Sequence, residues 1–384
     1  MAVTDLRRWL ILLCGLLFAL QARAAVLPPD RADVMYHKYD GGGMTIDGPS
    51  LLVRKSVSDN VSLSANYYVD QVSSASIDVV TTASPYTEER TEYTLSGDYL
   101  LNKTIISAGM TTSTENDYDA NTWFFGISQD FFGDLSTLAL SYSYGADSVG
   151  MSTDETFDEE IRRQNYQISW TQVVTKNLIM NLNYNIITDE GFLNNPYRSV
   201  RYLIDDENPA AGYLYEAELY PETHTSHAIA VRGRYYLPIR AAFLFEYRRF
   251  NDTWEINGYN LEFGYIQTFM EHWTAEARIR YYKQSAAEFY SDLFNRAGEF
   301  QYRARDKELS DFTDTTFGLG ISYEFKPQWT GDWIDRASAN LMVDFINFDY
   351  NNFRDLRTTT AAAGEEPLYS FDATVTRLFF SVWF

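Results

Sequence analysis

Few residues of this 384-residue chain stand in patterns that bind metals or perform catalysis. Asp117, Asp119 and Asn121 have the alternate spacing of a calcium loop, but the glycine and glutamate needed at its sixth and twelfth positions are missing. His224 and His227 would face opposite sides of a strand, so they make a poor pair of metal ligands. None of the four histidines stands in a motif with a serine nucleophile. We therefore expect no metal site, no cofactor and no enzyme.

Charged residues recur at alternate positions, and they carry the more informative pattern. Side chains alternate across a strand, so these residues share one face. The basic members, between about 225 and 284, are Arg232, Arg234, Arg240, Arg248, Arg278 and Arg280. The acidic members are Asp70, Glu92, Asp98 and Asp130 among small hydroxyl residues, and Glu246, Glu262 and Glu276 among the arginines. On the wall of a lumen they would create a transverse field that orients dipolar solutes. The alternative is that neighbouring strands pair these charges into ladders that fill and brace the lumen.

The segments that carry these charges read as amphipathic strands. In 61–71, Val61, Leu63 and Ala65 point one way, whereas Ser62 and Ser64 point the other. The same alternation recurs along the chain, over the segments 92–101, 122–131, 137–144, 163–171, 178–186 and 316–325. We count fifteen strands from about Asp47 to Phe384, and a sixteenth over Asp33–Tyr39. The prediction is an all-β fold, a transmembrane antiparallel up-and-down β-barrel of 14 to 16 strands.

The links between strands alternate between short and long. Short links lie near 58–60, 102–103, 132–134, 173–176, 237–238 and 270–272. Long links are expected over 72–90, 114–121, 146–161, 188–224, 285–314 and 350–367, with a short exception at 251–254 and a longer turn at 326–336. This alternation is typical of periplasmic turns and extracellular loops, and an even strand count places both termini on the periplasmic side. Gly191–Arg198 reads as an ordered turn that either folds into the mouth as a constriction or lies on the surface as a lid.

The first 24 residues have the pattern of a cleaved secretory signal. Arg7 and Arg8 precede the apolar stretch Trp9–Leu20, and Ala22-Arg23-Ala24 follows it. Cleavage after Ala24 would remove the only cysteine, Cys14. We expect residues 25–32 to form a periplasmic segment and 33–384 to form the barrel. The net charge of −22 argues against a nucleic-acid partner, because phosphate binding requires a basic face.

The location of the apolar face distinguishes a membrane barrel from a soluble barrel or sandwich. The chain has 25 Phe, 29 Tyr and 8 Trp, mostly at apolar positions, as expected for aromatic girdles at two lipid–water interfaces. Acidic clusters lie mostly in the long links and would face lipopolysaccharide. A terminal aromatic on an amphipathic last strand resembles the signal read by the barrel assembly machinery, and its apolar face consists of Leu378, Phe380, Val382 and Phe384. We predict insertion in the outer-membrane bilayer of a Gram-negative bacterium.

Three segments resemble a proteobacterial outer-membrane family of uncharacterised function, the domain-of-unknown-function family 3570. They are Tyr68-Val69-Asp70 running into 73–86, Gly191–Tyr202 and Arg280–Ser291. The resemblance covers almost the whole mature chain and implies the barrel fold and the outer-membrane location. It assigns no catalytic residue. Genes of this family often neighbour those of a small lipoprotein and a flavin-transfer protein, which implies a lipoprotein partner and an envelope redox setting.

Three functional hypotheses follow from the sequence. The leading one is a porin-like channel for small polar solutes, because about sixteen strands leave room for an aqueous lumen. The second is a plugged, non-conducting scaffold that holds an envelope partner, because two of the predicted links are too long to be turns. The third is a barrel enzyme whose residues meet only in space.

Overall fold

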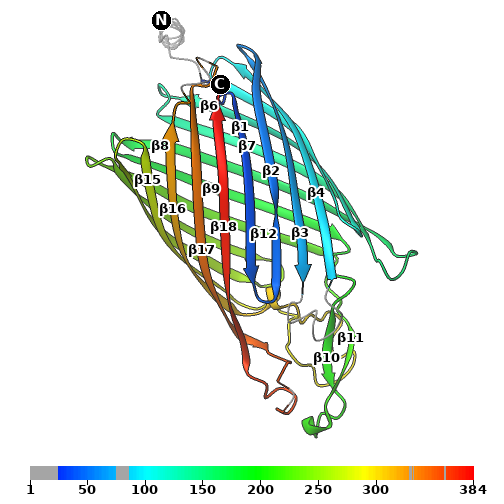
Figure 1. Cartoon of the computed structure of the whole chain (residues 1–384). Helices are drawn as coiled ribbons and strands as arrows, with labels where there is room; N and C mark the ends of the chain where they lie inside the picture. Colours follow the sequence, from blue (N-terminus) through cyan, green and yellow to red (C-terminus); the bar gives the residue numbers. More distant parts are fainter. Residues whose placement is uncertain (1–24, 75–85, 328–330, 332, 359) are drawn as a thin grey trace, which may run out of the picture.

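Sixteen strands close into one antiparallel barrel among the residues that the computed structural model describes, which are 25–74, 86–327, 331, 333–358 and 360–384 (Figure 1). The first nine are β1 (Arg31–Gly41), β2 (Met44–Ser58), β3 (Val61–Ser74), β4 (Tyr86–Leu101), β5 (Thr104–Thr114), β6 (Tyr118–Phe131), β7 (Ser136–Gly150), β8 (Asp158–Thr175) and β9 (Leu178–Gly191). The others are β12 (Thr223–Leu237), β13 (Ala241–Asp252), β14 (Asn257–Phe269), β15 (Trp273–Gln284), β16 (Phe312–Phe325), β17 (Arg336–Arg354) and β18 (Leu368–Trp383).

Each barrel strand pairs with its neighbours in the chain, and β1 closes the barrel against β18. In the closing pair, Val34 lies opposite Phe380 and Tyr36 opposite Leu378. Closure leaves no free sheet edge, so the strands satisfy one another's backbone groups. Between β9 and β12 the chain forms a separate hairpin of β10 (Ser199–Leu203) and β11 (Tyr213–Ala217). The predicted all-β, up-and-down barrel is confirmed, with the upper strand number of 16.

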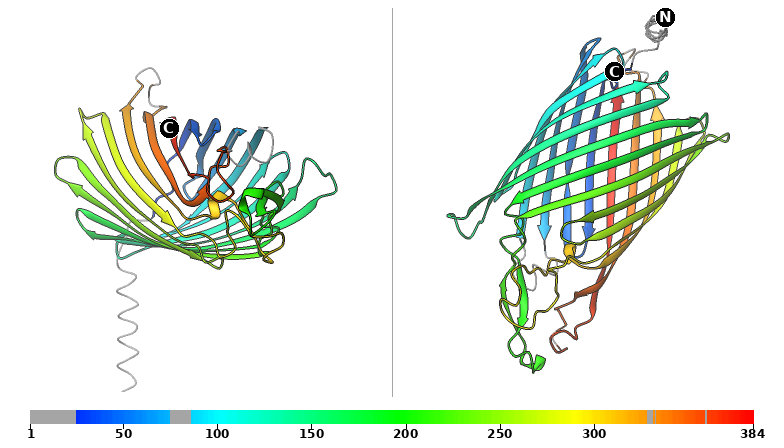
Figure 2. Two further views of the ribbon diagram at one scale, coloured as in Figure 1. Left: turned by 90° about the horizontal axis from the view of Figure 1, so that it is seen from below. Right: turned by 180° about the vertical axis from the view of Figure 1, so that it is seen from behind.

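The two ends of the barrel differ. Both ends of the barrel chain and most of the short turns lie at one end, called here the terminal end (Figures 1 and 2). The long links lie at the other, called the loop end. Several terminal-end turns use left-handed backbone, including Asn102 and Gly133 with φ of 58° and 67°. Such residues match the twist of tight hairpins.

The strands extend further toward the loop end than the sequence pattern predicts. The link predicted over 146–161 spans only 151–157, that over 114–121 only 115–117, and the others span 192–222, 285–311 and 355–367. β1 begins at Arg31, two residues before the predicted start. The strands were predicted too short because the apolar alternation ends before the backbone pairing does. In β8, for example, the outward residues are the charged Glu160 and Arg162, although the backbone of this part is still paired with β7 and β9. The predicted signal 1–24, and 75–85 of the link predicted over 72–90, lie outside the described residues.

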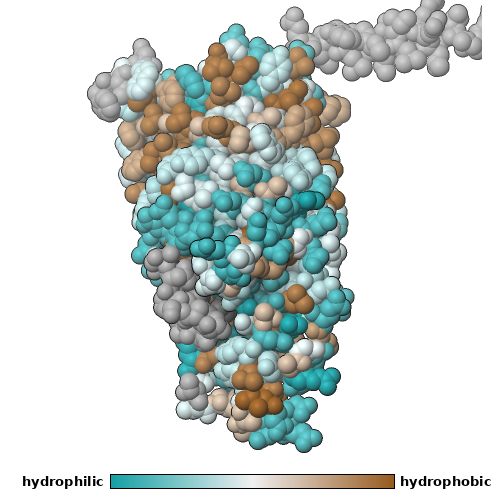
Figure 3. Space-filling model, turned by 90° about the vertical axis from the view of Figure 1, so that its right-hand side faces the viewer, coloured by the Kyte–Doolittle hydropathy of each residue, from teal (hydrophilic) through white to brown (hydrophobic). Residues whose placement is uncertain are grey.

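The apolar face of the strands is the exterior of the barrel. Leu95, Trp123 and Phe125 are 59%, 60% and 51% exposed, and the same holds for the alternate apolar positions of the other strands. Figure 3 shows a hydrophobic band toward the terminal end of the barrel and a mostly hydrophilic surface below it. Among the described residues, no helix is long and apolar enough to cross a membrane. The barrel therefore has an apolar belt near its terminal end and a polar extension at its loop end.

Candidate functional site

One side of the lumen, from β3 to β9, is lined by hydroxyl and amide groups. Side chains of neighbouring strands bond directly to one another, with Ser64 and Ser96 hydroxyls 2.6 Å apart and Thr94 and Thr111 hydroxyls 2.8 Å apart. The Asn185 amide donates to the Asn165 carbonyl oxygen at 2.8 Å. These rungs present a neutral polar surface to the lumen.

The predicted acidic residues of β3 to β6 lie on this inner face, each with a partner. Asp70 lies 2.7 Å from the His37 ring, and Asp130 accepts a hydrogen bond from Thr137 at 2.6 Å. Asp98 accepts from Arg54 at 2.5 Å and from Ser107 at 2.6 Å. Glu92 accepts from Arg90 at 2.6 Å. The partners His37, Arg54 and Arg90 did not appear in the sequence prediction.

The predicted basic residues of β12 to β15 mostly form ion pairs on the inner face. Their partners lie one or two strands away. Arg232 pairs with Glu246, which the sequence also placed on the wall, whereas the partners of Arg280 and Arg278, Asp314 at 2.8 Å and Asp344 at 2.7 Å, did not appear in the prediction. Asp344 also binds Arg377 of β18. Sequence separation explains the omission, because Arg278 and Asp344 are 66 positions apart and meet only through strand register.

The remaining predicted wall residues differ in their surroundings. Glu262 lies opposite both Glu246 and Arg280, and Glu276 lies on the same face opposite Gly320. Arg240 departs from the prediction, because it lies in the 238–240 turn with a φ of 60° and not on a strand. Among the described residues, Arg234 and Arg248 have no hydrogen bond or ion pair. They are the lumen arginines that keep their donors free.

The loop end carries a compact substructure, called here the mouth cap. It consists of the β10–β11 hairpin with its flanking links in 192–222, together with the links 285–311 and 355–367. Its centre is Arg201, which is 0% exposed. The Arg201 guanidinium binds Glu366 and Asp292, each at 2.5 Å, and donates to the Asp292 backbone carbonyl at 2.8 Å. One buried arginine thus joins three segments of the cap.

The link 285–311 of the mouth cap packs on the inner wall of the barrel. Gln284, a buried residue on the lumen face of β15, donates to the carbonyls of Glu308 and Ser310 at 2.8 and 2.9 Å. On one side of this link, Ala287 and Ala304 join an apolar cluster with Trp254 and Tyr220. On the other side, the Arg305 guanidinium lies 4.4 Å from the centre of the Phe353 ring. The link therefore narrows the loop-end mouth along β13 to β17.

The stretch predicted as a constriction, Gly191–Arg198, takes a different path from 285–311. The Tyr197 hydroxyl accepts a hydrogen bond from the Ser152 amide at 2.7 Å and donates to Asp117. These residues belong to the β7–β8 and β5–β6 links, so this stretch lies along the rim. Arg198 then forms an ion pair with Asp306 in the mouth cap.

One carboxyl group of the mouth cap has a strongly shifted pKa. Glu218 is 4% exposed and accepts hydrogen bonds from the Tyr220 hydroxyl at 2.6 Å and the Arg305 amide at 2.7 Å. Burial, with the nearby charge of Asp306, raises the pKa of Glu218 to about 7. The sequence gives no sign of this, because the shift depends on packing between distant links.

The histidines and the calcium-like spacing form no metal site in the described part of the chain, where no group of three or more suitable ligands meets. His224 faces the lumen, with its ring nitrogens 3.2 Å from Asp189 and 3.0 Å from Asp252. His227 is on the outer face, stacked with Tyr184.

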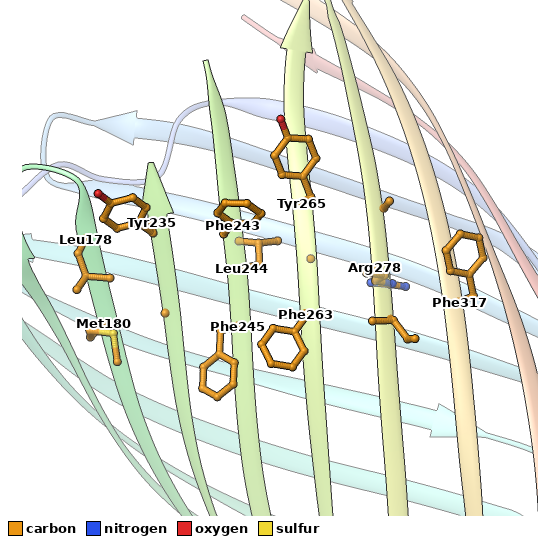
Figure 4. A pocket seen from close by; sticks show the side chains of 14 residues that line it. Leu178, Met180, Tyr235, Phe243, Leu244, Phe245, Phe263, Tyr265, Arg278 and Phe317 are labelled. Atoms are coloured by element: carbon orange, nitrogen blue, oxygen red, sulfur yellow. The ribbon is translucent and has the colours of Figure 1, made fainter. Parts of the chain in front are cut away.

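The outer wall carries an apolar groove of about 740 Å³ near the terminal end. Figure 4 shows Phe243, Phe245, Phe263 and Tyr265 around it, pointing away from the lumen, whereas Arg278 lies behind the strand. Met180 packs closely over Gly233 in the lining, where an added Cβ would lie 3.2 Å from the Met180 Sδ atom. On β18, Leu378 and Phe380 of the predicted assembly signal are exposed on this outer face, and Phe384 stacks with Trp333 just beyond the strand.

A closed barrel of sixteen antiparallel strands, with an apolar exterior belt and a polar lumen, is an outer-membrane β-barrel fold. Its sequence matches the family model described as Protein of unknown function (DUF3570) over residues 77–170 and 151–333. The two matches together cover more than half of the chain, and the protein belongs to this family. The resemblance noted in the sequence is confirmed.

Solved structures of outer-membrane proteins have a similar fold. A bacterial polysaccharide outer membrane secretin matches with a TM-score of 0.52 at 8% identity, over 93% of this chain and 100% of that one. The outer membrane protein opdK from Pseudomonas aeruginosa matches with a TM-score of 0.45 at 10% identity, over 94% and 100%. OmpT, an outer membrane protein of Vibrio cholerae, matches with a TM-score of 0.44 at 10% identity, over 92% and 98%. No curated protein matches the chain.

Proposed function

We propose that this protein is an outer-membrane channel for small polar solutes, narrowed at its loop end by the mouth cap. The observation that carries the proposal is the inner wall, where hydroxyl, amide and charged side chains face the lumen from most strands. Such a wall stabilises water and polar solutes along a path through the bilayer. In the proposed orientation, a signal peptide 1–24 is removed, 25–32 and the terminal end are periplasmic, and the mouth cap faces the cell exterior.

The paired charges favour a channel without strong ion selectivity. About half of the predicted wall charges form an ion pair with a neighbour, as in the bracing ladders, and this pairing reduces the net field across the lumen. Because the mouth cap covers part of the opening, solute size and local contacts at the cap should decide entry. The channel has no catalytic role in this proposal.

Single-channel recording tests the proposal. The detergent-folded mature chain is added to a planar bilayer, and steady open steps are expected. Deleting 288–303, which lie in the cap link, should increase the conductance, because the link narrows the mouth. A barrel shown to be folded that conducts neither with nor without this segment would refute the channel.

The second candidate, a closed scaffold for an envelope partner such as a small lipoprotein, is favoured by the buried Arg201 contacts, which give the mouth cap a fixed structure. Co-purification of one partner at fixed stoichiometry with a non-conducting barrel would support it over the channel.

A further inference from the structure

A cavity of about 290 Å³ lies inside the barrel directly beneath the mouth cap. Its walls are the lumen faces of β12 to β15, including Arg248, Phe250 and Tyr282, and residues Trp254 and Leu309 close it toward the cap. The volume corresponds to roughly ten water molecules at about 30 Å³ each. The cavity therefore has room for one small solute at the point where the cap narrows the mouth.

The two carboxylates beside this cavity, Asp189 and Asp252, have cationic partners: both contact His224, and Asp189 also lies 3.8 Å from Arg163. Both ring nitrogens of His224 face carboxylate oxygens, which only accept hydrogen bonds, so the ring is an imidazolium held between Asp189 and Asp252. Asp252 also accepts the backbone amides of Trp254 and Ile256 at 3.0 and 2.8 Å. Neither carboxylate is left to attract a cation.

Arg248 is the charged group of the cavity that stays available. Its cross-strand neighbours are Ala230 and Asn260, neither of which is charged. The nearest carboxylate along its own strand face, Glu246, already binds Arg232 and Asn260. The Arg248 side chain lines the cavity, and among the described residues it forms no hydrogen bond or ion pair, so its donors stay available to a ligand.

We propose that this cavity binds a small organic monocarboxylate with an aromatic or apolar body, an inference that names the solute class of the proposed channel and rests on that function. The Arg248 guanidinium matches a carboxylate with two parallel hydrogen bonds. Phe250, Trp254 and Tyr282 offer ring faces and edges to the apolar body, and Leu309 covers it from the cap. Aromatic and apolar side chains line this cavity together with a few polar groups, among them His224, Asp252 and Asn260, and such a mixed lining is typical of a small-molecule site.

Equilibrium binding to the detergent-folded full barrel tests this inference without requiring a current. Isothermal titration with benzoate is compared with benzamide, which has the same shape and no charge. We expect saturable binding of benzoate to the wild-type barrel. Benzamide should bind the wild type, and benzoate should bind Arg248→Met, at least about tenfold more weakly. The matched control is Arg234→Met, which removes another lumen arginine that forms no hydrogen bond or ion pair among the described residues. Arg234 does not line the cavity, so this substitution should change the affinity less than about twofold. Quenching of tryptophan fluorescence by benzoate should decrease in Trp254→Phe.

The outcomes separate the site from the channel. Absence of saturable benzoate binding, or equal weakening by the two arginine substitutions, overturns the site even when the barrel conducts. Binding that depends on Arg248 in a barrel that never conducts keeps the site and refutes the channel. Circular dichroism and heat-modifiable gel mobility verify that each variant is folded, and Arg248→Lys, which keeps the charge without the planar donors, should fall between wild type and Arg248→Met.

Discussion

The buried Arg201 makes the mouth cap the part of the molecule most sensitive to a single substitution. Arg201→Met keeps a long apolar stem and removes the charge that joins Asp292 and Glu366. Burial alone would raise the pKa of Glu366, but its bonds to Arg201 hold that pKa below the ordinary value. The substitution therefore leaves a carboxylate that is 3% exposed without its cation.

The free-energy cost of Arg201→Met depends on which partners Asp292 and Glu366 keep after the substitution. Breaking a buried ion pair by removing one partner typically costs about 3 to 5 kcal/mol. Asp292 keeps Arg305 at 3.0 Å, and Glu366 keeps the Gly364 amide at 2.8 Å, so the lower limit applies. About 3 kcal/mol of cap stability corresponds to a roughly 100-fold increase in the open population of the cap.

Hydrogen exchange of the folded barrel, followed peptide by peptide, measures this change. Peptides from 199–217 and 285–311 should exchange about 100 times faster in Arg201→Met, whereas strands such as β6 and β7 should be unchanged. The matched variant Arg201→Met/Glu366→Gln removes the unpaired charge as well and should recover much of the protection. Unchanged exchange in the cap, or equal acceleration in the barrel, would refute a cap held by Arg201.

Three further predictions concern the cap, the lumen and the outer wall. Glu218 has a pKa of about 7 in the folded cap against an ordinary 4.5, so the folded cap favours its protonated form. The resulting stabilisation is complete below pH 4.5 and is lost as the pH rises through 7, a decrease in cap stability of roughly 3 kcal/mol. Cap protection factors, which divide out the intrinsic base-catalysed rise in exchange, should therefore fall from pH 5 to 8, and fall less in Glu218→Gln. Asp344→Asn leaves two lumen arginines without their carboxylate, and should shift the reversal potential toward anion permeability. Phe125→Arg in the apolar belt should lower folding stability in liposomes by about 2 to 4 kcal/mol, whereas Asn121→Arg, on the same outer face nearer the loop end, should cost about 0 to 1 kcal/mol.

Each of these has a clear contrary result. Cap protection factors that stay constant or rise between pH 5 and 8 would contradict a buried, protonated Glu218. An unchanged reversal potential in a conducting Asp344→Asn barrel would place that residue outside the ion path. Equal costs for the two arginine substitutions on β6 would mean that the apolar belt does not mark the position of the bilayer.

The barrel fold was predictable from the sequence because every strand has one face toward lipid and one toward the lumen, so apolar and polar residues must alternate along it. Leu63 and Phe125 must face hydrocarbon while Ser64 and Gly126 face inward, so the alternation is visible in the sequence without any knowledge of pairing. The strand ends were not predictable, because beyond the membrane the outer face becomes polar while the backbone ladder continues. Glu160 and Arg162 therefore read as loop residues, although they lie in β8.

The functional contacts were not predictable for another reason. Arg201 and Glu366 are 165 positions apart, and each belongs to a link whose composition resembles a solvated loop. His224 and Asp252 meet only because β12 and β13 are paired in one particular register. Arg248 was identified on the inner wall, but its lack of a partner depends on which neighbours take the nearby carboxylates, and that cannot be deduced from one strand.

The ion pairs of the lumen wall and those of the mouth cap have different energetic roles. This difference indicates where along the barrel the entry of solutes is controlled. The side chains of Arg232 and Glu246 in the lumen are 51% and 23% exposed, so this pair is hydrated and stabilises the wall by about 1 kcal/mol or less. Arg278 and Arg280 bind carboxylates that are only 7% and 5% exposed, Asp344 and Asp314, so these pairs are held more firmly. Arg201 is fully buried, and its pairs must hold together because breaking them costs several times more. An exposed wall pair such as Arg232–Glu246 can therefore exchange partners with a passing solute at little cost, whereas the cap cannot loosen without a large penalty. Selection in this barrel should accordingly occur at the loop-end mouth, where the fixed cap meets the unpaired Arg248.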